Sequence, residues 1–272
     1  MSARVAEGMS EVEISRAPAS LARVDGWAIT TATMADAVRD TIAAARRGGG
    51  FSVVTLNLDH LVKLRRNDDF RRAYAAARIV TADGAPVAAL ARLQNRTIER
   101  TAGADLLVPL VEAAAEAGVA LYLYGSRDDV LARAGRALAS RCEGRLDIVG
   151  SSSPGANFDP TGPEADAAIA RIKASGARLV LLALGAPKQE IFAARAVAQG
   201  VDAGFVCIGA ALDFIVGAQV RAPGFMQRHG LEWLWRLATN PRRLGARYAQ
   251  CALLLADLTL VDPLRQRLAG SR

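Results

Sequence analysis

The chain has 272 residues, is 51% hydrophobic but only 5% aromatic, and carries a formal net charge of +7. Its length allows one large domain or two small ones with a substantial core. It holds no run of about 18 uncharged apolar residues, and its first 20 residues lack an apolar stretch, so we expect neither a membrane-spanning helix nor a secretory signal.

Short apolar runs alternate with amphipathic stretches along most of the chain. The pattern predicts helices at 34–47, around 58–77, and at 105–117, 128–142 and 164–175. It predicts strands at 51–57, 78–81, 119–124, 146–150, 178–185 and 201–208. We therefore expect an α/β fold with a mostly parallel sheet and helices on both faces.

Three parts of the chain differ in composition. We interpret residues 1–20 as a weakly ordered extension, 21–220 as the α/β domain, and 221–272 as a basic, helical C-terminal appendage. Nine arginines and three acidic residues give the last part a charge of +6 out of the +7 of the whole chain. Trp233 and Trp235 lie there as well. A basic and aromatic surface of this kind favours an anionic partner, such as a membrane surface or a lipid-linked diphosphate.

In parallel sheets ligands bind beyond the carboxyl ends of the strands. Polar residues and glycines collect at the carboxyl ends of the first three and the last two predicted strands. They are Thr55 and Asn57, Asp83 and Gly84, Gly125 and Ser126, 185–190, and 209–213. This convergence, rather than any single motif, predicts a binding site at that edge of the sheet.

The first two groups have a functional and a structural interpretation. Thr55 and Asn57 lie on the same side of a strand and suit a sugar or a phosphate, or else they cap the next helix. Asp83 is a lone carboxylate beside Gly84 and suits a general base, or else it caps the helix that starts near Ala85. The residues alone leave both choices open.

Two further groups carry possible anion contacts. Arg100 could reach an anion, while Asp105 could cap the following helix; here the structural interpretation is favoured. In Gly185-Ala-Pro187-Lys188-Gln189-Glu190 a strand turns into a helix, whose N-terminal N–H groups suit a diphosphate. An ordinary strand–helix turn explains this sequence equally well.

Several chemistries have little support. The three cysteines, Cys142, Cys207 and Cys251, are far apart and show no zinc spacing, so we expect free buried thiols. His60 and His229 stand alone, and no Asp-x-Asp follows a strand, so no metal and no cofactor are predicted. The calculated isoelectric point of about 9.9 could suggest nucleic acid, but the domain before Arg221 is nearly charge-balanced and contains no nucleic-acid-binding motif.

In combination, these residues resemble the WecG/TagA/CpsF glycosyltransferases, glycosyltransferase family 26. The resemblance runs from Thr55 to Tyr248 in the family's order. It rests on Thr55-x-Asn57, Ala82-Asp83-Gly84, Arg100-x-x-Gly103-x-Asp105, Tyr124-Gly125, Leu184-Gly185-x-Pro187-Lys188-Gln189-Glu190, Gly209-x-x-x-Asp213-x-x-x-Gly217, Arg221-Ala222-Pro223, Gly230-Leu-Glu-Trp-Leu-x-Arg236-Leu237 and Pro241-Arg-Arg-Leu-x-x-Arg247-Tyr248.

The resemblance implies a Rossmann-like α/β fold. It also implies an inverting, metal-independent transfer from a UDP-sugar to a polyprenyl-diphosphate-linked sugar at the cytoplasmic membrane face. Asp83 would be the general base, and Thr55 and Asn57 would line the sugar site. The donor would be held by Arg100, Gly125, Gly185, Pro187, Lys188, Gln189, Glu190, Gly209 and Asp213. The acceptor and the membrane would be met by Arg221, Arg228, Arg236, Arg243 and Arg247.

Some questions stay open at this stage. Leu212 replaces an aromatic residue that is frequent in the family, and the family's Pro-Pro-Phe-Gly-type loop appears only loosely at 153–158, so N-acetylmannosamine, its uronic acid and glucose all remain as donor sugars. The arginines of the appendage could instead be merely solvated, with Leu231, Trp233 and Leu234 packed on the domain. A non-catalytic nucleotide-sugar-binding protein is the alternative function, and a homo-oligomer is neither indicated nor excluded.

Overall fold

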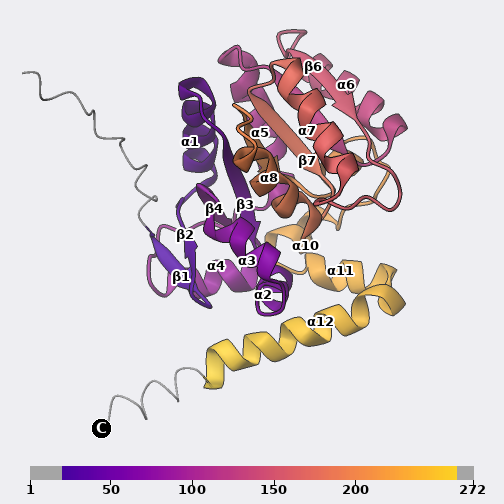
Figure 1. The fold of residues 1–272 in the computed structure, drawn as a ribbon. Helices are drawn as coiled ribbons and strands as arrows, with labels where there is room; N and C mark the ends of the chain where they lie inside the picture. The colour runs from indigo at the N-terminus through magenta and orange to yellow at the C-terminus, as the bar shows by residue number, and fades with distance from the viewer. Residues whose placement is uncertain (1–19, 262–272) are drawn as a thin grey trace, which may run out of the picture.

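The computed structural model describes residues 20–261. Six strands form one sheet in the order β4–β3–β8–β7–β5–β6, and every neighbouring pair is parallel (Figure 1). The strands are β3 (Phe51–Leu56), β4 (Ile79–Ala82), β5 (Leu121–Gly125), β6 (Ile148–Ser152), β7 (Leu179–Ala183) and β8 (Gly204–Cys207). The predicted Rossmann-like α/β class is confirmed, and this sheet is wholly parallel.

Successive side chains of each strand enter two separate hydrophobic cores, because they point to opposite faces of the sheet. One face is covered by α1 (Met34–Arg47), α5 (Gly103–Glu116), α6 (Asp128–Arg141) and α9 (Ala211–Ile215). The other is covered by α2 (Leu58–Leu64), α3 (Asp68–Ala75), α4 (Ala85–Arg92), α7 (Pro163–Ser175) and α8 (Lys188–Ala198). Burial on both faces explains why the strands are almost continuously apolar.

Two features differ from the sequence-based prediction. The single helix expected around 58–77 is wrong: α2 ends at Leu64, and Asn67 caps the start of α3 by accepting a hydrogen bond from the Phe70 N–H at 2.9 Å. A hairpin of β1 (Ala22–Val24) and β2 (Trp27–Ile29) was not predicted. Its Asp25-Gly26 turn has positive φ at both residues, 51° and 79°, which is a recognisable hairpin signal.

The segment that follows Val220 is helical in its described part, as predicted. It consists of α10 (Gly224–Arg228), α11 (Glu232–Thr239), α12 (Pro241–Ala256) and a π-helical turn (Asp257–Val261). We call residues 221–261 the C-terminal segment. Cys251 and Leu254 of α12 are buried in the core on the α2 side, and Figure 1 shows α12 running along the edge of the molecule beside α2. The predicted extension, residues 1–20, lies outside the described residues except for Ser20.

Candidate functional site

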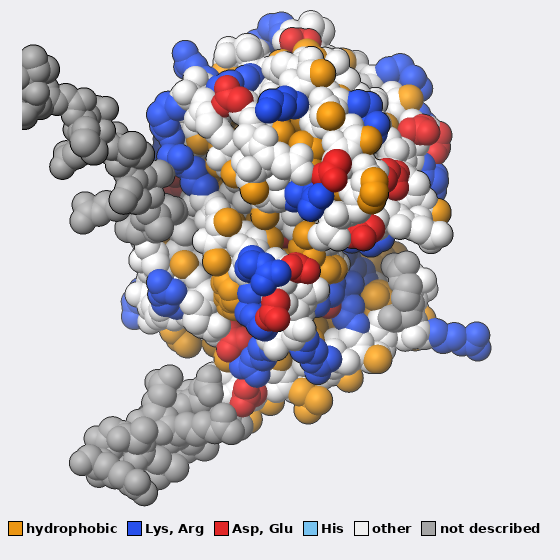
Figure 2. Space-filling model, viewed as in Figure 1, with side chains coloured by type: hydrophobic (Ala, Val, Ile, Leu, Met, Phe, Trp, Pro, Cys, Tyr) orange, Lys and Arg blue, Asp and Glu red, His pale blue; other side chains and the backbone are white. Residues whose placement is uncertain are grey.

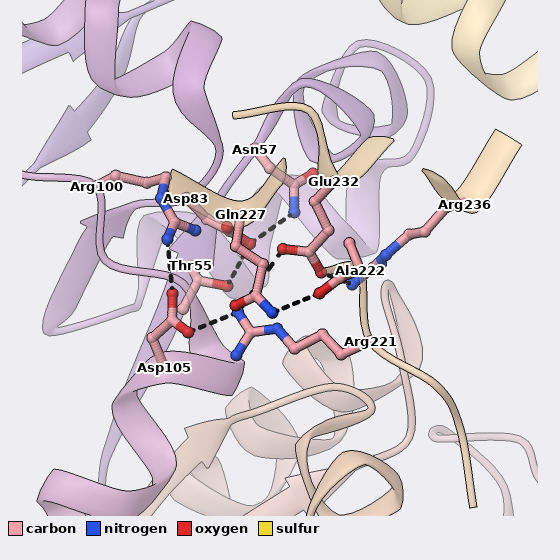
Figure 3. A network of polar contacts seen from close by, with 10 residues as sticks. All are labelled: Thr55, Asn57, Asp83, Arg100, Asp105, Arg221, Ala222, Gln227, Glu232 and Arg236. Atoms are coloured by element: carbon pink, nitrogen blue, oxygen red, sulfur yellow. Dashed lines mark hydrogen bonds and ion pairs between the residues drawn. The ribbon is translucent and has the colours of Figure 1, made fainter. Parts of the chain in front are cut away.

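The carboxyl ends of β3 and β4 bring three predicted site residues together. Thr55 stands opposite Thr81 in the parallel register, so Asn57 and Asp83 follow their strands side by side. The Asp83 carboxylate accepts a hydrogen bond from Asn57 Nδ2 at 3.2 Å and a longer one from Thr55 Oγ1 at 3.5 Å, both on Oδ2 (Figure 3). The structure thus places these three side chains in contact at the edge of the sheet where the sequence predicted a site.

Asn57 caps the next helix, which is the structural role that the sequence offered, and it also contacts Asp83. Its Oδ1 accepts a hydrogen bond from the His60 N–H at 3.0 Å and so caps α2. With Oδ1 occupied, the amide nitrogen is the atom that faces Asp83. The helix cap therefore fixes the orientation of a donor to the carboxylate.

Tyr74 and His60, which the sequence did not single out for the site, hold the backbone of Thr55 in place. The Tyr74 hydroxyl donates to the Thr55 carbonyl at 3.1 Å and lies 2.6 Å from His60 Nδ1. Both side chains are buried, and burial lowers the pKa of His60 to about 3, so its ring is neutral. No sequence signal points to this pair, because the residues that it links are not neighbours in the chain.

Asp83 is poised to titrate close to neutral pH. Burial raises the pKa of its carboxyl to about 6, while the hydrogen bond from Asn57 and the charges of Arg236 and Arg100 act in the opposite direction. The side chain retains partial exposure, so solvent can still reach it. A carboxylate with such a pKa can accept a proton from a hydroxyl group under physiological conditions.

A cleft of about 590 Å³ lies at the same edge of the sheet, beyond β5 and β7. Its lining includes Ser126, Arg127, Ser153, Phe158, Lys188, Asp213 and Gln219. Asp213 accepts hydrogen bonds from Ser126 Oγ at 3.3 Å on both oxygens. Cationic, hydroxyl and aromatic groups are thus present in one cleft, a combination that suits a nucleotide.

The 185–190 turn divides its residues between the cleft and the interior. Lys188 is the first residue of α8, directly after Pro187, and it lines the cleft. Gln189 and Glu190 point inward and are 3% and 1% exposed. Gln189 accepts from the Gly209 N–H at 3.2 Å and donates to Glu190 at 2.9 Å, so it ties the turn after β7 to the turn after β8.

Glu190 is the most deeply buried carboxyl group of this edge. Burial raises its pKa to about 7, and the hydrogen bond from Gln189 opposes that rise. Because both side chains face the protein, we expect any influence of Gln189 and Glu190 on a bound donor to pass through the backbone of Gly209.

Two arginines of the C-terminal segment pair with carboxylates of the domain, and a third pairs within the segment. Arg221 pairs with Asp105, Arg236 with Glu232, and Arg247 with Asp59, at 2.5, 2.8 and 2.7 Å (Figure 3 shows the first two). Arg228 is exposed on α10, and the side chain of Arg243 lies outside the described residues. The pairs that Arg221 and Arg247 make with the domain differ from the solvated alternative raised above.

Asp105 does not have the role that the sequence favoured. Ala102 is the N-cap of α5, and no side chain caps that helix end. Asp105 instead lies in the first turn and pairs with Arg100 at 3.0 Å as well as with Arg221. Arg100 is therefore held by this carboxylate, close enough to Asp83 to lower its pKa.

Large apolar side chains stay exposed on the C-terminal segment. Leu253, Leu260, Phe225, Trp233 and Leu234 are 72%, 64%, 55%, 43% and 42% exposed. In Figure 2 hydrophobic side chains stand among basic ones along the lower edge of the molecule, the part that α12 occupies in Figure 1. Over residues 20–261, no helix is long and apolar enough to cross a bilayer, and no group of three His, Cys, Asp or Glu side chains could hold a metal ion.

The comparison with known protein families decides the class of this site. The family model described as the glycosyl transferase WecG/TagA/CpsF family matches residues 22–269. The chain belongs to this family. The match extends over the β1–β2 hairpin, the sheet and the C-terminal segment, so it includes Asp83, the cleft and the paired arginines.

Membership makes the chain a glycosyltransferase of polysaccharide biosynthesis. Such an enzyme takes a sugar from a nucleotide-sugar donor and transfers it to a lipid-linked acceptor. The resemblance drawn from the sequence motifs is thereby confirmed at the level of the family. The donor sugar, the acceptor and the role of each residue are matters for the proposal that follows.

Proposed function

We propose that this WecG/TagA/CpsF glycosyltransferase is an inverting enzyme that moves a sugar from a UDP-sugar to a polyprenyl-diphosphate-linked sugar. Asp83 acts as the general base that takes the proton from the attacking acceptor hydroxyl. The observation that carries the proposal is the geometry of this carboxylate, which receives Asn57 and Thr55 on one oxygen and leaves the other without a hydrogen bond from the described residues. N-acetylmannosamine, its uronic acid and glucose are the candidate sugars.

The sheet order supports one placement of the donor. The cleft lies at β5 and β7, whereas Asp83 follows β4, and β8 and β3 lie between them. Three strand spacings of about 4.8 Å separate β7 from β4 by roughly 14 Å. An extended UDP-sugar can cover that span with its nucleotide in the cleft, its diphosphate near Gly209 and Lys188, and its sugar toward Asp83.

The chain offers cationic groups for the leaving group without a cofactor. As the bond between the sugar and UDP breaks, negative charge grows on the diphosphate. The N-terminus of the 11-residue helix α8, together with Lys188, can stabilise this charge. Attack from the face opposite the diphosphate inverts the sugar carbon, and a single base at Asp83 is sufficient for this reaction.

The decisive experiment is a transfer assay. UDP-sugars carrying the three candidate sugars are incubated with a short-chain polyprenyl-diphosphate-sugar in the presence of EDTA. Turnover with one donor is expected and identifies the sugar. Binding of UDP without transfer to any acceptor would instead support the alternative, a nucleotide-sugar-binding protein.

The C-terminal segment is proposed to bring the enzyme to the cytoplasmic face of the plasma membrane as a peripheral protein. The exposed Phe225 and Leu253 would enter the interface, and arginines would meet anionic lipid and the acceptor diphosphate. The mixture of exposed apolar and basic side chains on this segment supports the proposal. Nucleic acid is not proposed as a partner.

Replacing Phe225 and Leu253 together by Glu should weaken association with anionic liposomes by at least about tenfold, because each exposed side chain contributes about 1.5–3 kcal/mol when it leaves water. Co-sedimentation measures the effect. Val149→Glu is the control, since Val149 lies on β6, far from α12 in Figure 1. Equal binding by the double variant and the control would contradict the membrane role of this segment.

A further inference from the structure

A single carboxylate joins the catalytic edge to the C-terminal segment. Asp105 uses both of its oxygens: Oδ2 lies 3.0 Å from Arg100 Nη2, and Oδ1 lies 2.5 Å from Arg221 Nη2 (Figure 3). Asp105 and Arg221 are 23% and 22% exposed, so the pair is largely screened from water. Removing one partner of such a pair costs more than removing one partner of an exposed pair, because the remaining charge has little access to water.

Asp105 is held firmly relative to Asp83. The Thr101 N–H donates to the Ala82 carbonyl at 2.8 Å, and Thr81 Oγ1 donates to the Thr101 carbonyl at 2.8 Å. The start of α5 also presses against the end of β8, since a Cβ at Gly103 would lie 2.9 Å from the Cys207 carbonyl oxygen. Asp105 is therefore anchored to the strand end that carries the proposed base.

Arg221 is the residue through which the C-terminal segment contacts Asp105. Its guanidinium also lies 3.7 Å from Glu232 of α11 and 5.8 Å from the ring centroid of Phe214, the neighbour of Asp213. Arg236 shares both partners, at 2.8 Å from Glu232 and 5.8 Å from Phe214. Alternating charges thus run from Arg100 through Asp105, Arg221 and Glu232 to Arg236.

The segment anchored in this way covers the Asp83 loop. Gly230 packs so closely on Ala85, two residues after Asp83, that a Cβ at position 230 would lie 2.5 Å from the Ala85 Cβ. The charges of Glu232 and Arg236 both act on the pKa of Asp83. The position of α11 over the base therefore depends on contacts that fasten residues 221–236 to the domain.

We propose that Asp105 is a positioning residue that fastens the C-terminal segment over Asp83 by pairing with Arg221, and that it aligns Arg100 and Arg221 for the diphosphate of the acceptor. The inference rests on the proposed function for its effect on transfer. Without the carboxylate, Arg100 and Arg221 would face each other as like charges with reduced access to water. Their repulsion would open the segment and scatter the arginines that the acceptor needs.

The variant Asp105→Asn tests the fastening in the free protein. It keeps the shape of the side chain and removes its charge. Hydrogen exchange of backbone amides in residues 224–239 is expected to become at least about tenfold faster, while exchange in β7 stays unchanged. Glu112→Gln is the matched control, because Glu112 lies on the same helix and pairs with Arg141 at 2.7 Å on the surface.

A double-mutant cycle with Arg221→Gln separates a specific pair from a general loss of stability. If the two residues act as one contact, the double variant opens the segment no more than either single variant does. Arg221→Gln alone also decides the question if Asp105→Asn fails to fold. Unchanged exchange in residues 224–239 for the folded variants, or additive effects in the cycle, would overturn the proposal.

Kinetics extend the test to the acceptor. Asp105→Asn is expected to raise KM for the polyprenyl-diphosphate-sugar by about tenfold or more and to leave KM for the UDP-sugar within about twofold. An equal rise in KM for the acceptor and in KM for the UDP-sugar would contradict the role of Asp105 in aligning the acceptor. Hydrogen exchange needs no turnover, so a failure of the proposed function, seen as a wild-type protein without transfer, is distinguishable from a failure of this inference.

Discussion

Asp83→Asn is expected to lower kcat by about 10³-fold while the protein remains folded, because general-base catalysis contributes about 10²–10⁴-fold. The amide has the size of the carboxylate and can still meet Asn57 and Thr55, but it cannot take the proton of the acceptor hydroxyl. Asp68→Asn, on the exposed face of α3, serves as the control. A variant that keeps wild-type turnover would remove Asp83 as the base.

The pH dependence of the wild-type enzyme provides an independent check. Because the pKa of Asp83 is raised to about 6, kcat/KM should fall as the pH drops below that value and the carboxyl becomes protonated. The residual activity of Asp83→Asn should not show this step. A wild-type profile that stays flat between pH 5 and 8, against an expected step near the raised pKa of about 6, would contradict the assignment.

The raised pKa of Asp83 affects folding stability in the opposite direction. A higher pH ionises the proposed base and so favours the reaction, but it lowers the stability of the folded state. A carboxyl whose pKa is higher in the folded than in the unfolded protein makes the folded state less stable as the pH rises from about 4 to about 6. Above that window the cost is constant. Asp83→Asn should therefore melt at a higher temperature than wild type at pH 7.5, and the difference should shrink at pH 4. Glu190 titrates in both proteins, so its effect largely cancels in the comparison.

Gly125→Ala is expected to cost about 2–5 kcal/mol of folding stability and to abolish UDP binding. Gly125 ends β5 with φ of 111°, and a Cβ there would lie 2.5 Å from the Ala183 carbonyl oxygen of β7. Overpacking of about 1–3 kcal/mol adds to a backbone strain of about 1–2 kcal/mol. The clash is with backbone, so no side-chain rotation can relieve it.

Gly176→Ala isolates the strain from the clash. Gly176 has a φ of 73° after α7, and a Cβ there would meet nothing within 4 Å. This control should lose only about 1 kcal/mol and keep UDP binding. Chemical denaturation and UDP titration measure both effects. If the two variants were equally stable, the close approach of β5 and β7 would not be what requires glycine at position 125.

The alternation of apolar strands and amphipathic helices determined the class of the fold. Local propensity and periodicity are properties of short stretches, and here they agree with the tertiary structure. The exception at Arg65-Arg66-Asn67 has a local cause as well, because the Asn67 side chain caps a new helix. The Asp25-Gly26 turn carried a usable hairpin signal that was not taken up in the prediction.

The candidate site was predictable to the extent that it follows the strand ends. In a parallel sheet all carboxyl ends lie at one edge, so the sequence alone predicts that Thr55, Asn57 and Asp83 lie close together. The family motifs then supplied roles that spacing alone could not give. Which of these side chains face the ligand was not predictable, and the inward turn of Gln189 and Glu190 shows why: it depends on the Gly209 loop, 20 residues away.

By itself the sequence determined the parallel α/β fold, the edge that carries the site and the basic, helical character of the C-terminal segment. Only the tertiary structure decided which partners those charges take. Asp105 and Arg221 are 116 residues apart, and Asp59 and Arg247 are farther apart still, so no periodicity links them. Ion pairs of this kind form only after folding has brought distant helices together and has lowered the exposure of both partners, which is why the fastening of the C-terminal segment over Asp83 had to be read from the structure.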